Sequence, residues 1–207
     1  MKRHIVLAIT GASGSIYGIR LAEELLQGGH RLTLLMSRTG TEVLKYECGI
    51  DFGGDEATAA AKMREYFQAD ADRFCHYSVD NLFAPIASGS SAPDALVICP
   101  CSMGTLARVA AGISGTLIER TADVMLKERR PLILVPRETP LHDIHLENML
   151  KLSRMGVRIV PAMPAFYSGP SSLNHMIDFV VGKVLDSMGI GHKLFKRWGN
   201  ETEQEWT

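Results

Sequence analysis

A turn of small residues near the start of the 207-residue chain has the composition of a phosphate-binding loop. The segment GASGS, residues 11–15, follows the apolar run HIVLAIT and precedes a helical pattern. Glycine lets the backbone turn sharply and approach a ligand closely, and the first amides of a helix attract an anion. The glycines Gly11, Gly14 and Gly18 lack the spacing of the dinucleotide fingerprint. The segment therefore predicts an anion site of another kind, with a tight ligand-free turn as the alternative.

The residues after the second apolar run argue against a dinucleotide. Enzymes that bind NAD place an acidic residue near this point to hold the ribose, and this chain has Ser37. Arg38 would suit the 2′-phosphate of NADP, but no tyrosine is followed four residues later by lysine, as in the short-chain reductases. Ser37 thus favours a neutral or hydroxyl-rich ligand edge, and a helix N-cap is an equally good interpretation.

A second turn of small residues, from Cys101 to Thr105, follows the apolar run DALVICP. Ser102 or Thr105 can cap the next helix or donate to a ligand. Two such turns are a more specific signal than one. Cys99 and Cys101 flank a proline, but two thiols without a second Cys/His pair lack the spacing of a zinc site, so we expect buried apolar thiols. Upstream, residues 87–93 are rich in serine and form either a second anion site or a plain linker.

The charged pair Arg137 and Glu138 is the strongest single signal, because it follows the fully apolar run PLILVP. A guanidinium can hold a phosphate or a flavin edge with its fork of donors, and a glutamate beside it can relay a proton. A salt bridge that ties the loop to a helix is the alternative. Tyr167 offers an aromatic wall and a hydroxyl to a ligand, and a residue packed in the core is the alternative interpretation. Lys183 is placed to reach toward the strand ends or to stay solvated.

Two further polar patterns have plain interpretations. His142 and His145 share a helix face, but without an obvious third ligand we interpret them as polar residues of a helix N-terminus. The run from Lys127 to Arg130 ends a predicted helix, where cations suit the dipole, so a solvated surface is expected.

Apolar runs that alternate with helical patterns predict how these residues are positioned. Near-continuous apolar strands are typical of a parallel sheet covered on both faces. We therefore expect a single doubly wound, Rossmann-like or flavodoxin-like α/β domain, whose ligand lies beyond the carboxyl ends of the strands. The expected strands are 4–10, 30–37, 73–79, 94–100, 131–136 and 157–163, and the expected helices are 14–27, 39–47, 57–67, 103–112, 115–128, 142–156 and 171–189.

The composition fits one ordinary globular domain. Hydrophobic residues make up 46% and charged residues 22% of the chain, and the net charge of −1 argues against a nucleic-acid partner. The apolar run after Lys2 and Arg3 is too short for a signal peptide or a membrane span. Four scattered cysteines indicate reduced thiols, so we expect a cytoplasmic protein.

Taken together, these segments resemble the UbiX flavin prenyltransferases. The resemblance covers nearly the whole chain, and it rests on TGASGSIYGIRL, ASGSSAPDALVICPCSMGTL, ADVMLKERRPLILVPRETPLHDIHLENMLKL and PAFY. The part ERRPLILVPRETP is highly specific. The fold implied is that of the wider flavin-dependent cysteine decarboxylase superfamily.

The resemblance implies a metal-independent transfer reaction. Reduced FMN attacks dimethylallyl phosphate through N5, phosphate leaves, and a second bond at C6 closes a fourth ring. The product is the cofactor of UbiD-type decarboxylases. The resemblance also implies a homo-dodecamer with sites shared between subunits. Two alternatives stay open, an FMN-dependent decarboxylase and a non-catalytic flavin-binding subunit of a decarboxylase complex.

The resemblance also assigns site residues and domains. Residues 1–190 would form the FMN-binding domain, and residues 191–207 a tail in which Trp198 is a possible cap. Proton transfer falls to Ser13 and Glu138, with Glu47 as a further catalytic candidate. Lys183 replaces an arginine of many relatives, and Leu82 a tryptophan of some. The implied FMN contacts are Gly11, Ala12, Ser13, Ser37, Ser102, Met103, Gly104, Thr105 and Arg137, and the implied contacts of dimethylallyl phosphate are Ser88, Gly89, Lys127, Arg137, Tyr167 and Lys183.

Overall fold

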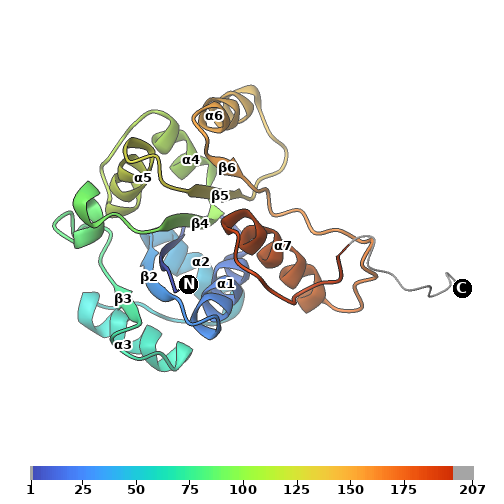
Figure 1. Ribbon diagram of the computed structural model, residues 1–207, viewed down its shortest axis with the longest axis horizontal. Helices are drawn as coiled ribbons and strands as arrows, with labels where there is room; N and C mark the ends of the chain where they lie inside the picture. Colours follow the sequence, from blue (N-terminus) through green and yellow to red (C-terminus); the bar gives the residue numbers. More distant parts are fainter. Residues whose placement is uncertain (1, 198–207) are drawn as a thin grey trace, which may run out of the picture.

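The chain forms a parallel six-stranded sheet with the order β3-β2-β1-β4-β5-β6 in a computed structural model that describes residues 2–197 (Figure 1). This order confirms the doubly wound fold. The chain winds outward from β1 to one edge and then from β4 to the other, so the order reverses between β1 and β4. The strands are β1 (His4–Ile9), β2 (Arg31–Met36), β3 (Phe74–His76), β4 (Ala95–Cys101), β5 (Leu132–Pro136) and β6 (Arg158–Ile159).

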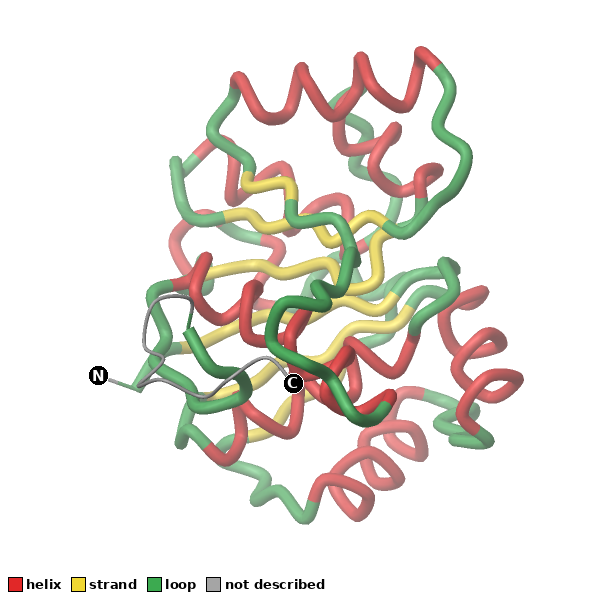
Figure 2. Tube along the Cα trace, turned by 90° about the vertical axis from the view of Figure 1, so that its right-hand side faces the viewer, coloured by secondary structure: helices red, strands yellow, loops and turns green. Residues whose placement is uncertain are grey.

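Helices cover both faces of the sheet, as the apolar strands require. One face carries α1, α3 and α7, and the opposite face carries α4, α5 and α6 (Figures 1 and 2). Within residues 2–197 we find no helix long and apolar enough to cross a membrane. The helices are α1 (Ser15–Gln27), α2 (Arg38–Cys48), α3 (Glu56–Phe67), α4 (Met103–Ala110), α5 (Leu117–Lys127), α6 (Asp143–Arg154) and α7 (Leu173–Met188).

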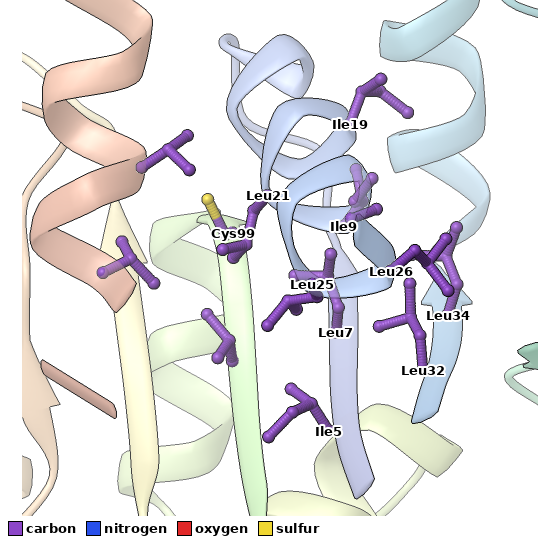
Figure 3. Close-up of a cluster of buried hydrophobic side chains, with 14 of the residues drawn as sticks. Ile5, Leu7, Ile9, Ile19, Leu21, Leu25, Leu26, Leu32, Leu34 and Cys99 are labelled. Atoms are coloured by element: carbon purple, nitrogen blue, oxygen red, sulfur yellow. The ribbon is translucent and has the colours of Figure 1, made fainter. Parts of the chain in front are cut away.

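The central strand β1 serves both halves of the core. Ile5, Leu7 and Ile9 point toward α1, whereas Val6 and Ala8 point to the opposite face, and all five are fully buried. Figure 3 shows α1 packed over β1, with Leu32 and Leu34 of β2 on one side of Ile5, Leu7 and Ile9 and Cys99 of β4 on the other. Helix α1 can lie this close because it has glycine at position 18, where a Cβ would collide with the Cys99 carbonyl. The packing thus fixes where the loop before α1 lies.

Three expectations from the sequence are wrong in detail. The last strand contains only Arg158 and Ile159, because β6 is an edge strand and Pro161 follows it shortly. The third strand, expected over residues 73–79, contains only Phe74–His76, because β3 is also an edge strand. The serine-rich segment is no open linker, because it forms two short 3₁₀ turns, Pro85–Ala87 and Gly89–Ser91, packed against α5.

Candidate functional site

The turns after β1 and β4 meet at the carboxyl edge of the sheet, where the strand order reverses. Thr10 joins them: its buried hydroxyl donates to the Pro100 carbonyl at 2.9 Å and accepts from the Ser102 amide at 2.8 Å. Ligands of doubly wound folds bind at this point. The sequence interpretation missed Thr10, although a polar residue closing an otherwise apolar strand was a usable signal.

Replacing Thr10 with valine is expected to lower the free energy of unfolding by about 1–3 kcal/mol, because the Ser102 amide loses its acceptor. Thr10→Ser keeps the hydroxyl and serves as the matched control. Urea unfolding of both variants measures the difference. Equal stability of the two variants would show that the hydroxyl bridge contributes nothing.

The N-terminus of α1 is already occupied by a carboxylate of the chain itself. Glu47, at the end of α2, accepts hydrogen bonds from the amides of Gly14 at 2.9 Å and Ser15 at 3.1 Å. Burial alone would raise the pKa of Glu47, but bonds from the Ser13 hydroxyl and these two amides, with the charge of Arg137, outweigh it and lower the pKa. Glu47 is therefore ionised at neutral pH, and the two amides already have an anionic acceptor within the chain.

The serines after β2 and β4 both cap helices. The Ser37 hydroxyl accepts from the Gly40 amide at 3.0 Å, and the Ser102 hydroxyl accepts from the Thr105 amide at 3.3 Å. Ser102 also donates to the Thr105 hydroxyl at 3.0 Å. At the start of α4, the amides of Met103 and Gly104 have no acceptor within the helix. Capping by Ser102 does not exclude ligand binding, because these two amides still lack an acceptor within the helix.

Gly11 is needed for packing of the chain against itself. A Cβ at this position would lie 2.6 Å from the Thr39 side chain at the start of α2. Gly14 has a φ of 96°, in the left-handed region, and so needs glycine for its backbone. The odd glycine spacing thus reflects the joining of three elements, β1, α1 and α2.

Arg137 connects the end of β5 to the turn after β1. Its Nε donates to the Ser13 carbonyl at 3.2 Å. Tyr17 lies nearby on α1: burial and then Cys99 raise the pKa of its phenol, and the charge of Arg137 opposes this rise. The sequence interpretation missed Tyr17, which only looked like a helix residue. Glu138 is exposed beside Arg137, and its carboxylate accepts from the Thr139 amide at 3.0 Å.

A second cluster of polar residues lies at the amino edge of the sheet, where the strands begin. The Ser88 and Ser90 hydroxyls are 3.0 Å apart, and Gly89 lies so close to Glu128 that a Cβ would collide with its carboxylate. Lys127 pairs with Glu128 at 3.3 Å, where α5 leads into the start of β5. Strand β4 spans about 20 Å between the two edges. Within one chain, therefore, Ser88, Gly89 and Lys127 do not meet Arg137.

Tyr167 and Lys183 lie beyond β6 and on α7. Tyr167 is half-buried and packs edge-on against Phe179, with ring centroids 5.7 Å apart. Lys183 is exposed. Leu82 is 43% exposed in the segment before the 3₁₀ turns. Trp198 lies outside the described residues.

The cysteine and histidine pairs play structural roles. Burial raises the pKa of Cys101 to about 12 and that of Cys99 further, so both thiols stay protonated. This confirms the prediction of buried apolar thiols. His142 caps α6 by accepting from the His145 amide at 3.4 Å, which confirms the helix N-terminus interpretation. Among residues 2–197, no three Cys, His, Asp or Glu side chains gather as a metal site.

Comparison with known proteins gives closely similar sequences over nearly the full length. The family model described as Flavoprotein matches residues 1–196. The flavin prenyltransferase UbiX of Halalkalibacterium halodurans is 52% identical over 199 residues, covering 95% of this chain and 94% of that protein. The flavin prenyltransferase UbiX of Pseudomonas aeruginosa is 48% identical over 197 residues, covering 95% of this chain and 94% of that protein.

Solved structures share the architecture as well. AnUbiX (PadA1), crystallised in complex with FMN and dimethylallyl pyrophosphate, superposes with a TM-score of 0.86 at 39% identity, covering 97% of this chain and 100% of that one. A dodecameric FMN-dependent UbiX-like decarboxylase from Escherichia coli O157:H7 gives a TM-score of 0.84 at 39% identity, covering 95% and 100%. Sequence and fold thus point to the same relatives.

Proposed function

Because this chain belongs to the UbiX flavin prenyltransferases of the Flavoprotein family, we propose that it transfers the dimethylallyl group of dimethylallyl phosphate to FMN. Reduced FMN supplies N5 and then C6 as nucleophiles, phosphate leaves, and the flavin gains C5H8. The observation in the structure that carries the proposal is the contact between Arg137 and Ser13, which brings a cation and the neighbouring Glu138 carboxylate to the carboxyl edge of the sheet, beside the turn after β1.

The donors at the carboxyl edge fit FMN. They are hydroxyls of Ser13, Ser37 and Ser102, the first amides of α4, and the guanidinium of Arg137. Such a set suits one phosphate and a neutral polar ring system better than the two phosphates and diol of a dinucleotide. Ser15 supports this fit, because its hydroxyl is fully buried beside the site without a hydrogen-bond partner in residues 2–197.

The side chains of this edge have separable tasks. The α4 amides bind the phosphate of FMN, and Arg137 stabilises the charge that develops on the phosphate of the donor as it leaves. Glu47, ionised and anchored on α1, holds the Ser13 hydroxyl in place. Glu138 takes up and returns the protons exchanged around the flavin.

A second copy of the chain completes the binding site for the phosphate of the donor. Ser88, Gly89 and Lys127 lie at the amino edge of the sheet, so a single chain does not bring these three donor contacts to Arg137 at the carboxyl edge. A dodecameric relative of 39% identity supports an assembly in which one subunit's amino edge faces another subunit's site. Tyr167 and Lys183 supply the remaining donor contacts in this proposal.

The wider setting follows from the same family. The prenylated FMN is released to a UbiD-type decarboxylase, which uses it as cofactor. Residues 1–190 form the FMN-binding domain in this proposal. Four free cysteines fit a reducing, cytoplasmic location.

The direct test is anaerobic incubation with reduced FMN and dimethylallyl phosphate, followed by mass spectrometry of the released flavin. We expect a flavin heavier by C5H8 together with an equal amount of phosphate. Unchanged flavin with dimethylallyl phosphate and with its diphosphate contradicts the proposal. Release of carbon dioxide from an aromatic acid by this protein alone supports a decarboxylase instead, and tight FMN binding with neither product supports a binding subunit.

A further inference from the structure

Three aromatic rings pack in a row along α7, one from the loop before it, one from the helix itself and one from the segment after it. The Tyr167 ring meets Phe179 edge-on at a centroid distance of 5.7 Å and an interplanar angle of 86°. On its other side Phe179 packs against Phe195, with ring centroids 4.9 Å apart. Phe179 is only 7% exposed. The position of the Tyr167 ring therefore depends on a residue beyond the end of α7.

Phe195 belongs to a segment that runs back along α7, residues 190–197, which we call the tail strap (Figure 1). Gly182 on α7 provides the seat for this strap. A Cβ at Gly182 would lie 2.5 Å from the Phe195 ring and 2.6 Å from the His192 ring. Since real Cβ contacts are longer, the strap packs in this way only against glycine.

Asp186 clamps the strap one helical turn further along α7. Its carboxylate accepts from both terminal nitrogens of Arg197, at 2.7 Å and 3.3 Å. His192 contacts the same carboxylate at 3.2 Å. A two-pronged arginine–carboxylate pair fixes geometry as well as charge. The strap is thus held by a shape fit at Gly182 and a charge clamp at Asp186.

We propose that the tail strap, seated on Gly182 and clamped by Asp186, positions Tyr167 through Phe179 for binding of the dimethylallyl phosphate donor. This inference rests on the proposed function, because only there is Tyr167 a donor contact. FMN binds at the carboxyl edge through residues that do not touch the strap. Displacing the strap therefore weakens the donor selectively. Gly182, Phe179 and Phe195 are positioning residues, and none of them touches the reacting atoms.

Gly182→Ala tests the proposal, with Gly191→Ala as the matched control, since a Cβ at Gly191 meets nothing within 4 Å. Release of the strap is measured as the rate of trypsin cleavage after Lys193 and Lys196. Donor affinity is measured calorimetrically with dimethylallyl phosphate on protein loaded with oxidised FMN, which cannot react. Arg197→Ala is the second variant, because it opens the clamp from the exposed side and leaves α7 intact.

For Gly182→Ala and Arg197→Ala we expect about tenfold faster cleavage and about tenfold weaker donor binding, with FMN affinity unchanged. In turnover the KM for the donor rises while kcat changes little. Gly191→Ala behaves as the wild type in every assay. Faster cleavage with unchanged donor affinity overturns the positioning role, and unchanged cleavage in both variants overturns the clamp. If wild type binds no donor at all, the proposed function itself fails, and the cleavage rates still decide whether the clamp exists.

Discussion

Replacing Glu138 with glutamine is expected to slow formation of prenylated FMN by about 10²–10⁴-fold, the usual range for loss of a general acid–base group. Glutamine has nearly the same shape but cannot take up a proton. It also retains an oxygen for the Thr139 amide that Glu138 now accepts from at 3.0 Å. FMN binding is therefore expected to stay within twofold of wild type. Single-turnover kinetics under anaerobic conditions measure the rate, and fluorescence titration measures FMN affinity.

The matched control for this variant is Glu147→Gln, which changes an exposed glutamate in the middle of α6. It makes the same chemical change without touching the site. Turnover at the wild-type rate in Glu138→Gln would remove the proton-relay role. A loss of FMN binding that accounts for the whole rate change would assign Glu138 to binding instead.

Replacing Arg137 with glutamine is expected to weaken FMN binding by about 10–100-fold, because hydrogen bonds to a charged group contribute about 1.5–3 kcal/mol. The variant also loses the contact to the Ser13 carbonyl. Arg137→Lys is expected to recover part of the affinity, since lysine keeps the charge but not the planar fork of donors. Fluorescence titration at fixed ionic strength gives the comparison.

The Arg137→Gln variant is also expected to change how the stability of the protein depends on pH at acid pH. The charge of Arg137 helps to lower the pKa of Glu47, so its loss moves that pKa up toward the ordinary value of 4.5. The stabilising contact of Glu47 with the α1 amides is then lost at a higher pH as the solution is acidified. At neutral pH Glu47 stays ionised in both proteins. The control for both effects is Arg154→Gln, which removes the charge of an exposed arginine on α6. Identical FMN affinity in Arg137→Gln and Arg154→Gln would contradict the role of Arg137 in FMN binding.

The sequence predicts most of the fold because local and global patterns agree. Strands such as β4 and β5 are apolar throughout, so burial on both faces follows directly from composition. The glycine- and serine-rich turns after β1 and β4 mark the carboxyl edge of the sheet correctly. The edge strand β6 is shorter than predicted, because hydrogen-bonded length depends on partners that sequence periodicity does not reveal.

The sequence predicts the residue types of the site better than their spatial arrangement. The sequence predicts an anion site at the N-terminus of α1, and in the structure the carboxylate of Glu47 accepts from the Ser15 amide there. Glu47 is 32 residues from Ser15 in sequence and reaches this amide only because α2 lies against α1. Such a contact depends on the packing angle of two helices. Likewise the separation of Lys127 from Arg137 follows from helix direction, since α5 carries Lys127 back to the amino edge of the sheet. Periodicity alone contains neither piece of information.

The central claim is that a carbon of the donor becomes bonded to flavin N5, and one labelling measurement tests it most directly. Dimethylallyl phosphate carrying ¹³C at C1′ is incubated anaerobically with the protein and reduced FMN carrying ¹⁵N at N5, and the flavin product is examined by NMR. We predict a one-bond coupling between the labelled carbon and the labelled nitrogen. Recovery of all the ¹³C as unreacted donor or as dimethylallyl alcohol, with no such coupling, would contradict the account.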